Sequence, residues 1–207
     1  MKLSLSLLVF SFLLACAQPI KDKTIGIQLF NSFSSEESSA VKDSISKTYH
    51  CSVKILPIVE VPLEMVTKIK SFRFRADSLL NLLDRLQPDS IDIMVGLTST
   101  DIAITKINKE TGKIKKPIST YTDWAIFGLG RINGVSCVIS NYRLKKGASH
   151  KKYLKRLTRI CNHEIGHVLG LRHCPNSKCL MNDANETIKT IDKSTGNLCK
   201  ACSKIIF

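Results

Sequence analysis

The chain has 207 residues, 43% of them hydrophobic, which is enough for one sizeable core with at most a small appended subdomain. Its mean hydropathy is close to zero, which is not the value of an integral membrane protein. The formal net charge is +14, from 31 basic and 17 acidic residues. Such a balance fits either anionic partners or a lysine-rich solvated surface.

The N-terminal segment is typical of an export signal. Lys2 precedes the apolar run 3–14, which is shorter than a typical membrane-spanning helix and fits the hydrophobic region of a signal peptide. The run ends in Leu-Leu-Ala-Cys and resembles the lipobox of bacterial lipoproteins, in which Cys16 is lipidated. Ordinary cleavage after Ala17 is the alternative, because Ala-Cys-Ala also matches a small-x-small site.

In both interpretations residues 1–15 are not part of the folded domain. We expect a signal peptide over residues 1–15, a tether over 16–23 and one domain over 24–207. A lipid on Cys16 would hold the domain at the bacterial cell envelope, on a periplasmic or outer-membrane face. Cleavage after Ala17 would instead release a soluble periplasmic or secreted protein. The membrane, reached through the N-terminal lipid, is therefore an expected partner, and export argues against nucleic acid.

Alternating apolar residues predict the strands of the domain, and apolar residues at helical spacing predict its helices. The expected strands are 24–30, 51–61, 91–97, 124–129 and 135–140, and the expected helices are 34–49, 75–86 and 149–169. Ser34 and Glu37 have the spacing of a capping box, Pro57 restricts the second strand to an edge or a bend, and Asn133-Gly134 predicts a hairpin. Residues 106–116 are polar and basic, which is typical of a solvated loop or hairpin tip. This order indicates one α/β or α+β domain.

The stretch CNHEIGHVLGLRHCPNSKC, residues 161–179, contains three of the five histidines in the chain. His163 and His167 are four residues apart, about one helical turn, so their imidazoles can point the same way and bind one ion. Gly170 can end the helix in the left-handed conformation, after which the chain can return His173 to the same ion. The extended pattern H-E-x-x-H-x-x-G-x-x-H is the metzincin signature, and it favours a metal site over ordinary histidines on a helix.

Three neutral histidine ligands leave the fourth position of a tetrahedral zinc ion for water, which is the open site that catalysis requires. Zinc lowers the pKa of such a water to about 7 and polarises a scissile carbonyl. Glu164 follows the first ligand and is displaced around the helix, so it can reach the water without binding the metal. It is therefore the candidate general base, which takes the proton of the water and passes it to the leaving amine.

Four cysteines follow directly. Cys174 and Cys179 form one short pair and Cys199 and Cys202 another, about twenty residues later, and this spacing suits a structural zinc site with four thiolates. Export to an oxidising compartment favours the alternative of two disulfides. The short pairs and the adjacent metal-binding segment favour zinc. The other cysteines of the domain are expected to be buried small residues: Cys51, Cys137 and Cys161.

From His163 onward the chain reads H-E-x-x-H-x-x-G-x-x-H-C-x4-C-x-M-x17-C-x-x-C, and this spacing closely resembles the archaemetzincin family of zinc metallopeptidases. Upstream blocks such as WAIFGLGRINGVSCVISNYRL are also similar to the family, so the resemblance spans roughly residues 24–207. It implies a compact zincin-type, metzincin-like α/β domain with a mixed twisted sheet, an active-site helix and a Cys-rich C-terminal segment. It also implies four roles. His163, His167 and His173 bind the catalytic zinc, and Glu164 is the general base. The second zinc is bound by Cys174, Cys179, Cys199 and Cys202, and Met181 is the Met-turn residue beneath the histidines.

The function that this resemblance implies is zinc-dependent hydrolysis of peptide bonds in peptide or protein substrates, with two zinc ions per chain in a monomer. Endo- and aminopeptidase action both stay open. The export signal is a departure, because many family members look cytosolic. The alternative from another class is a zinc-stabilised envelope binding protein with vestigial peptidase activity. The intact Glu164 favours the enzyme, because a binding module does not require it.

Overall fold

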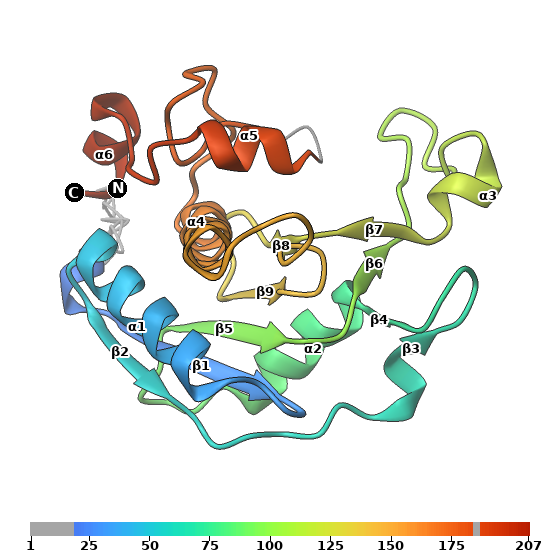
Figure 1. Ribbon diagram of the computed structural model, residues 1–207, viewed down its shortest axis with the longest axis horizontal. Helices are drawn as coiled ribbons and strands as arrows, with labels where there is room; N and C mark the ends of the chain where they lie inside the picture. The colour runs from blue at the N-terminus through green and yellow to red at the C-terminus, as the bar shows by residue number, and fades with distance from the viewer. Residues whose placement is uncertain (1–18, 184–186) are drawn as a thin grey trace, which may run out of the picture.

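The computed structural model describes residues 19–183 and 187–207 (Figure 1). The expected signal peptide and Cys16 lie outside these residues. Within the described part of the chain, no helix combines the length and the apolar character that crossing a membrane requires.

A mixed five-stranded sheet forms the centre of the molecule, with the strand order β2-β1-β5-β9-β8. Its strands are β1 (Thr24–Phe30), β2 (Ser52–Ile55), β5 (Ile93–Thr98), β8 (Gly128–Gly130) and β9 (Ser136–Ser140). The first four in the order run parallel, and β8 pairs antiparallel with β9. Every residue of β5 and β9 is buried, which explains why near-continuous apolar sequence forms these strands.

A smaller mixed sheet extends the first, with the order β3-β4-β6-β7. Its strands are β3 (Val66–Thr67), β4 (Arg73–Arg75), β6 (Ile102–Ile104) and β7 (Trp124–Ile126). The expected strand 124–129 is therefore divided, because β7 belongs to this sheet and β8 to the larger one. The expected strand 51–61 is too long, since β2 ends at Ile55 and Val59 forms only an isolated bridge to Phe30.

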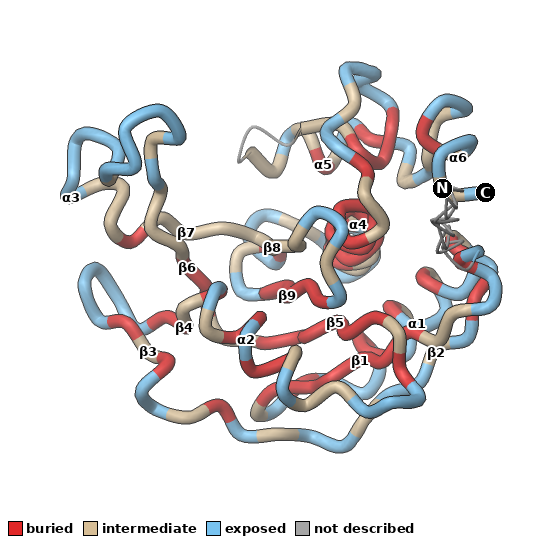
Figure 2. The backbone as a smooth tube through the Cα atoms, turned by 180° about the vertical axis from the view of Figure 1, so that it is seen from behind, coloured by how far each residue is buried: buried red, intermediate tan, exposed pale blue. Residues whose placement is uncertain are grey.

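Helices cover both faces of the larger sheet. The helices are α1 (Ser35–Tyr49), α2 (Ala76–Leu86), α3 (Ile118–Tyr121), α4 (His150–Val168), α5 (Ile188–Lys193) and α6 (Lys200–Ile206), with 3-10 turns η1 (Ile20–Asp22) and η2 (Leu63–Met65). Alternate residues of β5 face opposite ways: Val95 joins the core with α1 and α4, and Met94 joins the core with α2. Figure 2 shows α4 and the central strands as the most buried part of the backbone.

The two long helices begin at the capping residues that their sequences contain. The backbone N–H of Glu37 donates to Ser34 Oγ, which confirms the predicted start of α1, and that of Lys152 donates to Ser149 Oγ at the start of α4. The hairpin between β8 and β9 is also confirmed, with Asn133 at φ 55° in its turn. A single α/β domain with mixed sheets is thus the observed fold.

The start of α4 is basic, and one of its cationic side chains, that of Arg156, is buried, with 3% of it exposed. Its guanidinium donates to both carboxylate oxygens of Asp192 at 2.8 Å and to the carbonyls of Leu144 and Lys146. Lys152 Nζ also contacts this carboxylate, at 2.9 Å from Oδ2 of Asp192. These contacts tie α5 to the active-site helix.

This ion pair predicts a pH-dependent loss of stability in Asp192→Asn. The hydrogen bonds from Arg156 lower the pKa of Asp192 from the ordinary 3.8 to about 2. A pKa lowered on folding stabilises the folded state above the unfolded pKa, and this contribution is lost as the pH falls through the folded pKa. We expect the variant to be less stable by about 2 kcal/mol at pH 7 and pH 5, with the difference shrinking between pH 4 and pH 2. Urea unfolding at each pH measures it, with the exposed Asp43→Asn as the control that changes little.

Candidate active site

The last two turns of α4 carry the first half of the predicted motif. His163, Glu164 and His167 are all buried there, on the side of the helix that faces β8 and the segment after the helix. Gly170 ends the helix with φ 91°, a conformation that favours glycine. The backbone then turns back, and His173 returns to the other two rings. One nitrogen from each of the three histidines lies within 4.8 Å of the others.

Two backbone carbonyls orient the buried imidazoles. Nδ1 of His163 donates to the carbonyl oxygen of Leu180, and Nδ1 of His167 donates to that of Leu171, both at 2.8 Å. This tautomer leaves the Nε2 lone pairs pointing into the site. Burial lowers the pKa of His163 to about 4 and also lowers that of His167, so both rings are neutral at pH 7, as metal ligands must be.

The spacing of the ring nitrogens fits zinc. Nε2 of His167 and Nε2 of His173 are 3.2 Å apart. Two zinc–nitrogen bonds of about 2.1 Å at a tetrahedral angle hold their nitrogens about 3.4 Å apart. Asp183 Oδ2 lies 3.5 Å from Nδ1 of His173, on the side of the ring away from the other histidines. Three converging ring nitrogens, two of them on imidazoles oriented by carbonyls, thus offer the kind of donor set that an open zinc site needs.

The carboxylate of Glu164 lies between α4 and β8. A Cβ at Gly128 would stand 2.8 Å from Cγ of Glu164, and one at Gly130 would stand 2.6 Å from the backbone oxygen of Glu164, so only glycine lets the strand approach this closely. Burial raises the pKa of Glu164 to about 8, and a hydrogen bond from the Gly130 backbone partly offsets this. A divalent cation held by the histidines would favour the ionised carboxylate.

Met181 lies beneath the histidine-bearing turns. Its side chain is fully buried, and a Cβ at Gly166 would collide with its sulfur. The backbone N–H of Cys174 donates to the carbonyl oxygen of Met181 at 2.8 Å. The segment around Met181 therefore supports both the helix and the returning segment that carries His173.

The four predicted cysteines come together in a second cluster. Their sulfurs lie within 4.8 Å of one another, and the distances Cys174 Sγ–Cys199 Sγ and Cys179 Sγ–Cys202 Sγ are both 3.8 Å. Zinc–sulfur bonds of about 2.3 Å in a tetrahedron separate the sulfurs by about 3.8 Å. All four are free thiols. The cluster thus has the geometry of a closed four-thiolate site.

The two clusters share their backbone. Cys174 follows His173 directly, and Cys179 precedes Leu180, whose carbonyl orients His163. Any interaction that holds Cys174 and Cys179 in place therefore also positions His173 and the carbonyl of Leu180, which is the hydrogen-bond partner of His163. The sequence places these residues side by side, but only the fold brings Cys199 and Cys202 to the same point.

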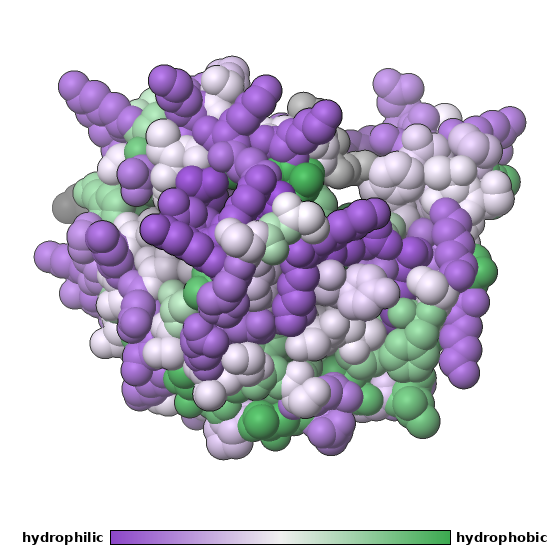
Figure 3. Space-filling view, viewed as in Figure 1, coloured by the Kyte–Doolittle hydropathy of each residue, from purple (hydrophilic) through white to green (hydrophobic). Residues whose placement is uncertain are grey.

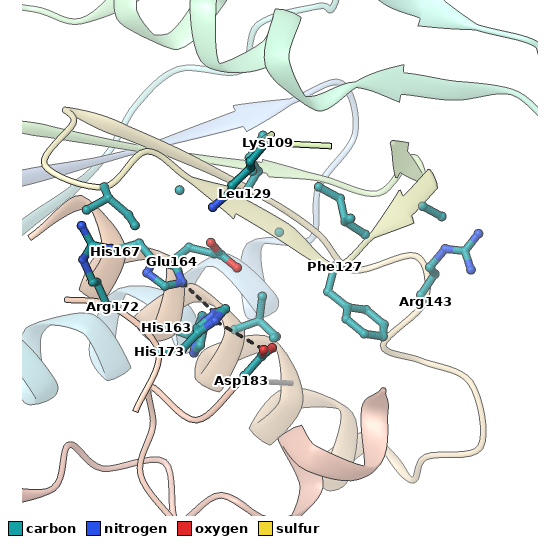
Figure 4. A pocket seen from close by; sticks show the side chains of 16 residues that line it. Lys109, Phe127, Leu129, Arg143, His163, Glu164, His167, Arg172, His173 and Asp183 are labelled. Carbon is teal, nitrogen blue, oxygen red and sulfur yellow. Dashed lines mark hydrogen bonds and ion pairs between the residues drawn. The ribbon is translucent and has the colours of Figure 1, made fainter. Parts of the chain in front are cut away.

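A cavity of about 620 Å³ opens beside the three histidines and Glu164 (Figure 4). Its opposite wall is the β7–β8 segment, and side chains that the sequence did not identify complete it: Lys109, Phe127, Leu129, Arg143, Arg172 and Asp183. Arg143 is held by both carboxylate oxygens of Asp101. No spacing pattern could have found Asp183 or the β8 residues, because tertiary folding alone brings them to the histidines.

Comparison with known proteins places this site in a family. The profile described as Peptidase family M54 matches residues 27–206. The archaemetzincin of Methanocaldococcus jannaschii is 30% identical over 156 residues, which cover 73% of this chain and 75% of that protein. The archaemetzincin of Halobacterium salinarum is 27% identical over 172 residues, which cover 79% of this chain and 88% of that protein.

Solved structures of archaemetzincins are similar to this chain as well. The crystal structure of archaemetzincin from Archaeoglobus fulgidus, complexed with malonate, has a TM-score of 0.69 at 27% identity and covers 88% of this chain and 99% of that one. The archaemetzincin of Methanopyrus kandleri, at 24% identity, shares the fold with a TM-score of 0.72 over 90% and 94% of the two chains. With the profile spanning most of the chain and a histidine cluster built for zinc, the chain belongs to Peptidase family M54, the archaemetzincins, and is a zinc metallopeptidase.

Proposed function

We propose that His163, His167 and His173 hold the catalytic zinc and that Glu164 is the general base of peptide-bond hydrolysis. One observation carries the proposal: the three ring nitrogens converge within 4.8 Å of one another, beside the buried carboxylate of Glu164. Zinc bound there would act as a Lewis acid and lower the pKa of a water molecule to about 7.

Glu164 has the placement that proton transfer needs. Its carboxylate lines the cavity together with the histidines, and the Gly130 backbone holds it by a hydrogen bond. It would accept a proton from the attacking water and then donate it to the leaving nitrogen. The glycines of β8 keep the carboxylate between strand and helix, so its position is fixed before substrate arrives.

The substrate would bind along the edge strand β8. This strand is the last in the order of the larger sheet, and its residues line the cavity opposite the histidines. A peptide in extended form would add main-chain hydrogen bonds along such an edge, with its scissile carbonyl facing the histidines. Side chains of a peptide bound in this way would lie next to Phe127 and Leu129.

We further propose that Cys174, Cys179, Cys199 and Cys202 bind a second, structural zinc. The 3.8 Å sulfur separations support it, because they match four thiolates around one ion and are well beyond the S–S bond of about 2.05 Å. The second ion would hold the segment that returns His173.

Lipid attachment at Cys16 is a separate proposal, supported by the Leu-Leu-Ala-Cys sequence. It places the peptidase at the bacterial cell envelope. Cells fed a fatty-acid analogue are expected to label the wild-type chain and not Cys16→Ala. A wild-type chain that takes up no label would instead assign the segment to an ordinary signal peptide, and equal labelling of both chains would place the lipid at a residue other than Cys16.

Removal of the metal tests the proposed activity. Incubation with a zinc chelator is expected to abolish cleavage of a mixed peptide library by the purified chain, and added zinc is expected to restore it. The products, read by mass spectrometry, distinguish internal cleavage from removal of N-terminal residues. A zinc-loaded chain that cleaves no peptide at any pH would instead support a zinc-stabilised binding protein.

A further inference from the structure

The free end of the smaller sheet has no part in the active site apart from Lys109. It consists of the turn 68–72, between β3 and β4, and of residues 106–122, between β6 and β7, which include α3. Lys70 Nζ donates to the carbonyl oxygen of Thr120 at 2.7 Å, so the two segments lie together. Figure 1 shows them at the right of the molecule, and we refer to them as the lysine-rich tip.

The tip is strongly basic. Its 22 residues contain seven lysines and a single acidic residue, Glu110. Six of the lysines are exposed: Lys68, Lys70, Lys109, Lys113, Lys115 and Lys116. A surface with this charge attracts an anionic partner and repels a cationic one.

Large apolar side chains project from the same tip. Ile69 is 60% exposed, Phe72 52%, Ile107 45% and Ile118 56%. Phe72 is held in place by an edge contact with Phe74, at a ring separation of 6.0 Å. The apolar residues alternate with lysines along the chain, as in Lys68-Ile69-Lys70. Figure 3 shows hydrophobic side chains among hydrophilic ones on this side of the molecule.

This combination fits the interface of an anionic bilayer. Lysines at a membrane surface meet lipid phosphates, while separate apolar side chains enter the boundary between headgroups and acyl chains. A purely solvated loop would not expose an aromatic ring and three isoleucines in so short a stretch. An acidic protein partner would use the charges, but it would leave four outward-pointing apolar side chains without a role. We propose that the lysine-rich tip binds the surface of an anionic lipid bilayer.

The proposed contact is independent of Cys16, because it lies in the folded domain. It also orients the enzyme. Lys109 belongs both to the tip and to the wall of the catalytic cavity, so the mouth of the cavity would open beside the bilayer. Peptide segments close to a membrane surface would then reach the histidines first.

A local probe tests the proposal in the full chain, whatever the N-terminal segment does. The variant Phe72→Trp is mixed with vesicles of phosphatidylcholine, alone or with phosphatidylglycerol, and the emission of the native Trp124 is subtracted with the wild-type chain. The matched control is Tyr142→Trp, because Tyr142 is an aromatic residue outside the tip and is 60% exposed. We expect a blue shift and quenching by brominated lipid for Phe72→Trp on anionic vesicles, weaker at high salt, and no response from the control.

The charges are tested in the same background. Replacing Lys68, Lys70, Lys115 and Lys116 with Gln is expected to abolish the shift. An equal response of both tryptophan variants, or a response that neutral vesicles reproduce in full, would overturn the proposal. Phe72→Trp that ignores the vesicles and responds to poly-glutamate would also overturn it, and would assign the tip to an acidic protein.

Discussion

Replacing Glu164 with Gln is expected to lower kcat/KM for peptide hydrolysis by about 100- to 10,000-fold while the zinc content of the chain stays the same. Gln has the shape of Glu, so the packing against Gly128 and Gly130 is kept. Its amide cannot accept the proton of the attacking water. Because Glu164 is not one of the three histidines proposed to bind the metal, metal binding is expected to survive.

The chain contains a matched control for this variant. Glu37 is a carboxylate with the same 7% exposure as Glu164, but it is bound to Asn141 Nδ2 and Lys145 Nζ at the start of α1. Glu37→Gln tests the effect of removing any buried carboxylate, and we expect it to keep its peptidase activity. Steady-state kinetics and elemental analysis on both variants make the comparison. Wild-type activity in Glu164→Gln would rule out the proposed general base.

The second large effect is expected from Cys179→Ala. Loss of one of the four proposed thiolate ligands should release the proposed structural zinc and strongly lower the unfolding temperature. Structural zinc sites contribute about 10–16 kcal/mol of binding free energy in small peptides, which is as large as the whole stability of a typical domain, about 5–15 kcal/mol. Activity should fall as well, because Cys179 precedes Leu180, which orients His163.

Cys51→Ala is the control for this substitution, since Cys51 is also a buried free thiol but lies outside the cluster. It should keep both ions and most of the stability. Calorimetry with zinc and thiol titration distinguishes the alternatives. If the wild-type chain held one zinc ion and no titratable thiols among the four cysteines, two disulfides would replace the proposed site.

Local patterns were enough to predict the long helices and the candidate site. The cap at Ser34, the turn at Asn133 and the helical spacing from His163 to His167 all depend on residues a few positions apart, and each of these elements formed as expected. The buried Cys51, Cys137 and Cys161 were also predicted correctly. The histidines and cysteines that come together are spaced as metal ligands are, and this spacing can be recognised without a structure.

Features that depend on distant residues were missed. Strands of two or three residues, such as β3 and β4, are too short to show periodicity. Nothing within the segment 124–129 shows that it changes sheets after Ile126. The burial of Arg156 depends on Asp192, 36 residues away, so nothing in the sequence near Arg156 indicates it. The role of β8 as a cavity wall likewise required the fold.

The central claim is that one chain carries two zinc ions in two adjacent and different sites. Anomalous diffraction at the zinc edge, from crystals of the purified wild-type chain, tests it most directly. The account predicts two peaks, one bounded by Nε2 of His163, His167 and His173 and one at the centre of the four sulfurs of Cys174, Cys179, Cys199 and Cys202. A histidine cluster without a peak in zinc-containing crystals, or sulfurs joined in pairs with no peak between them, would contradict it.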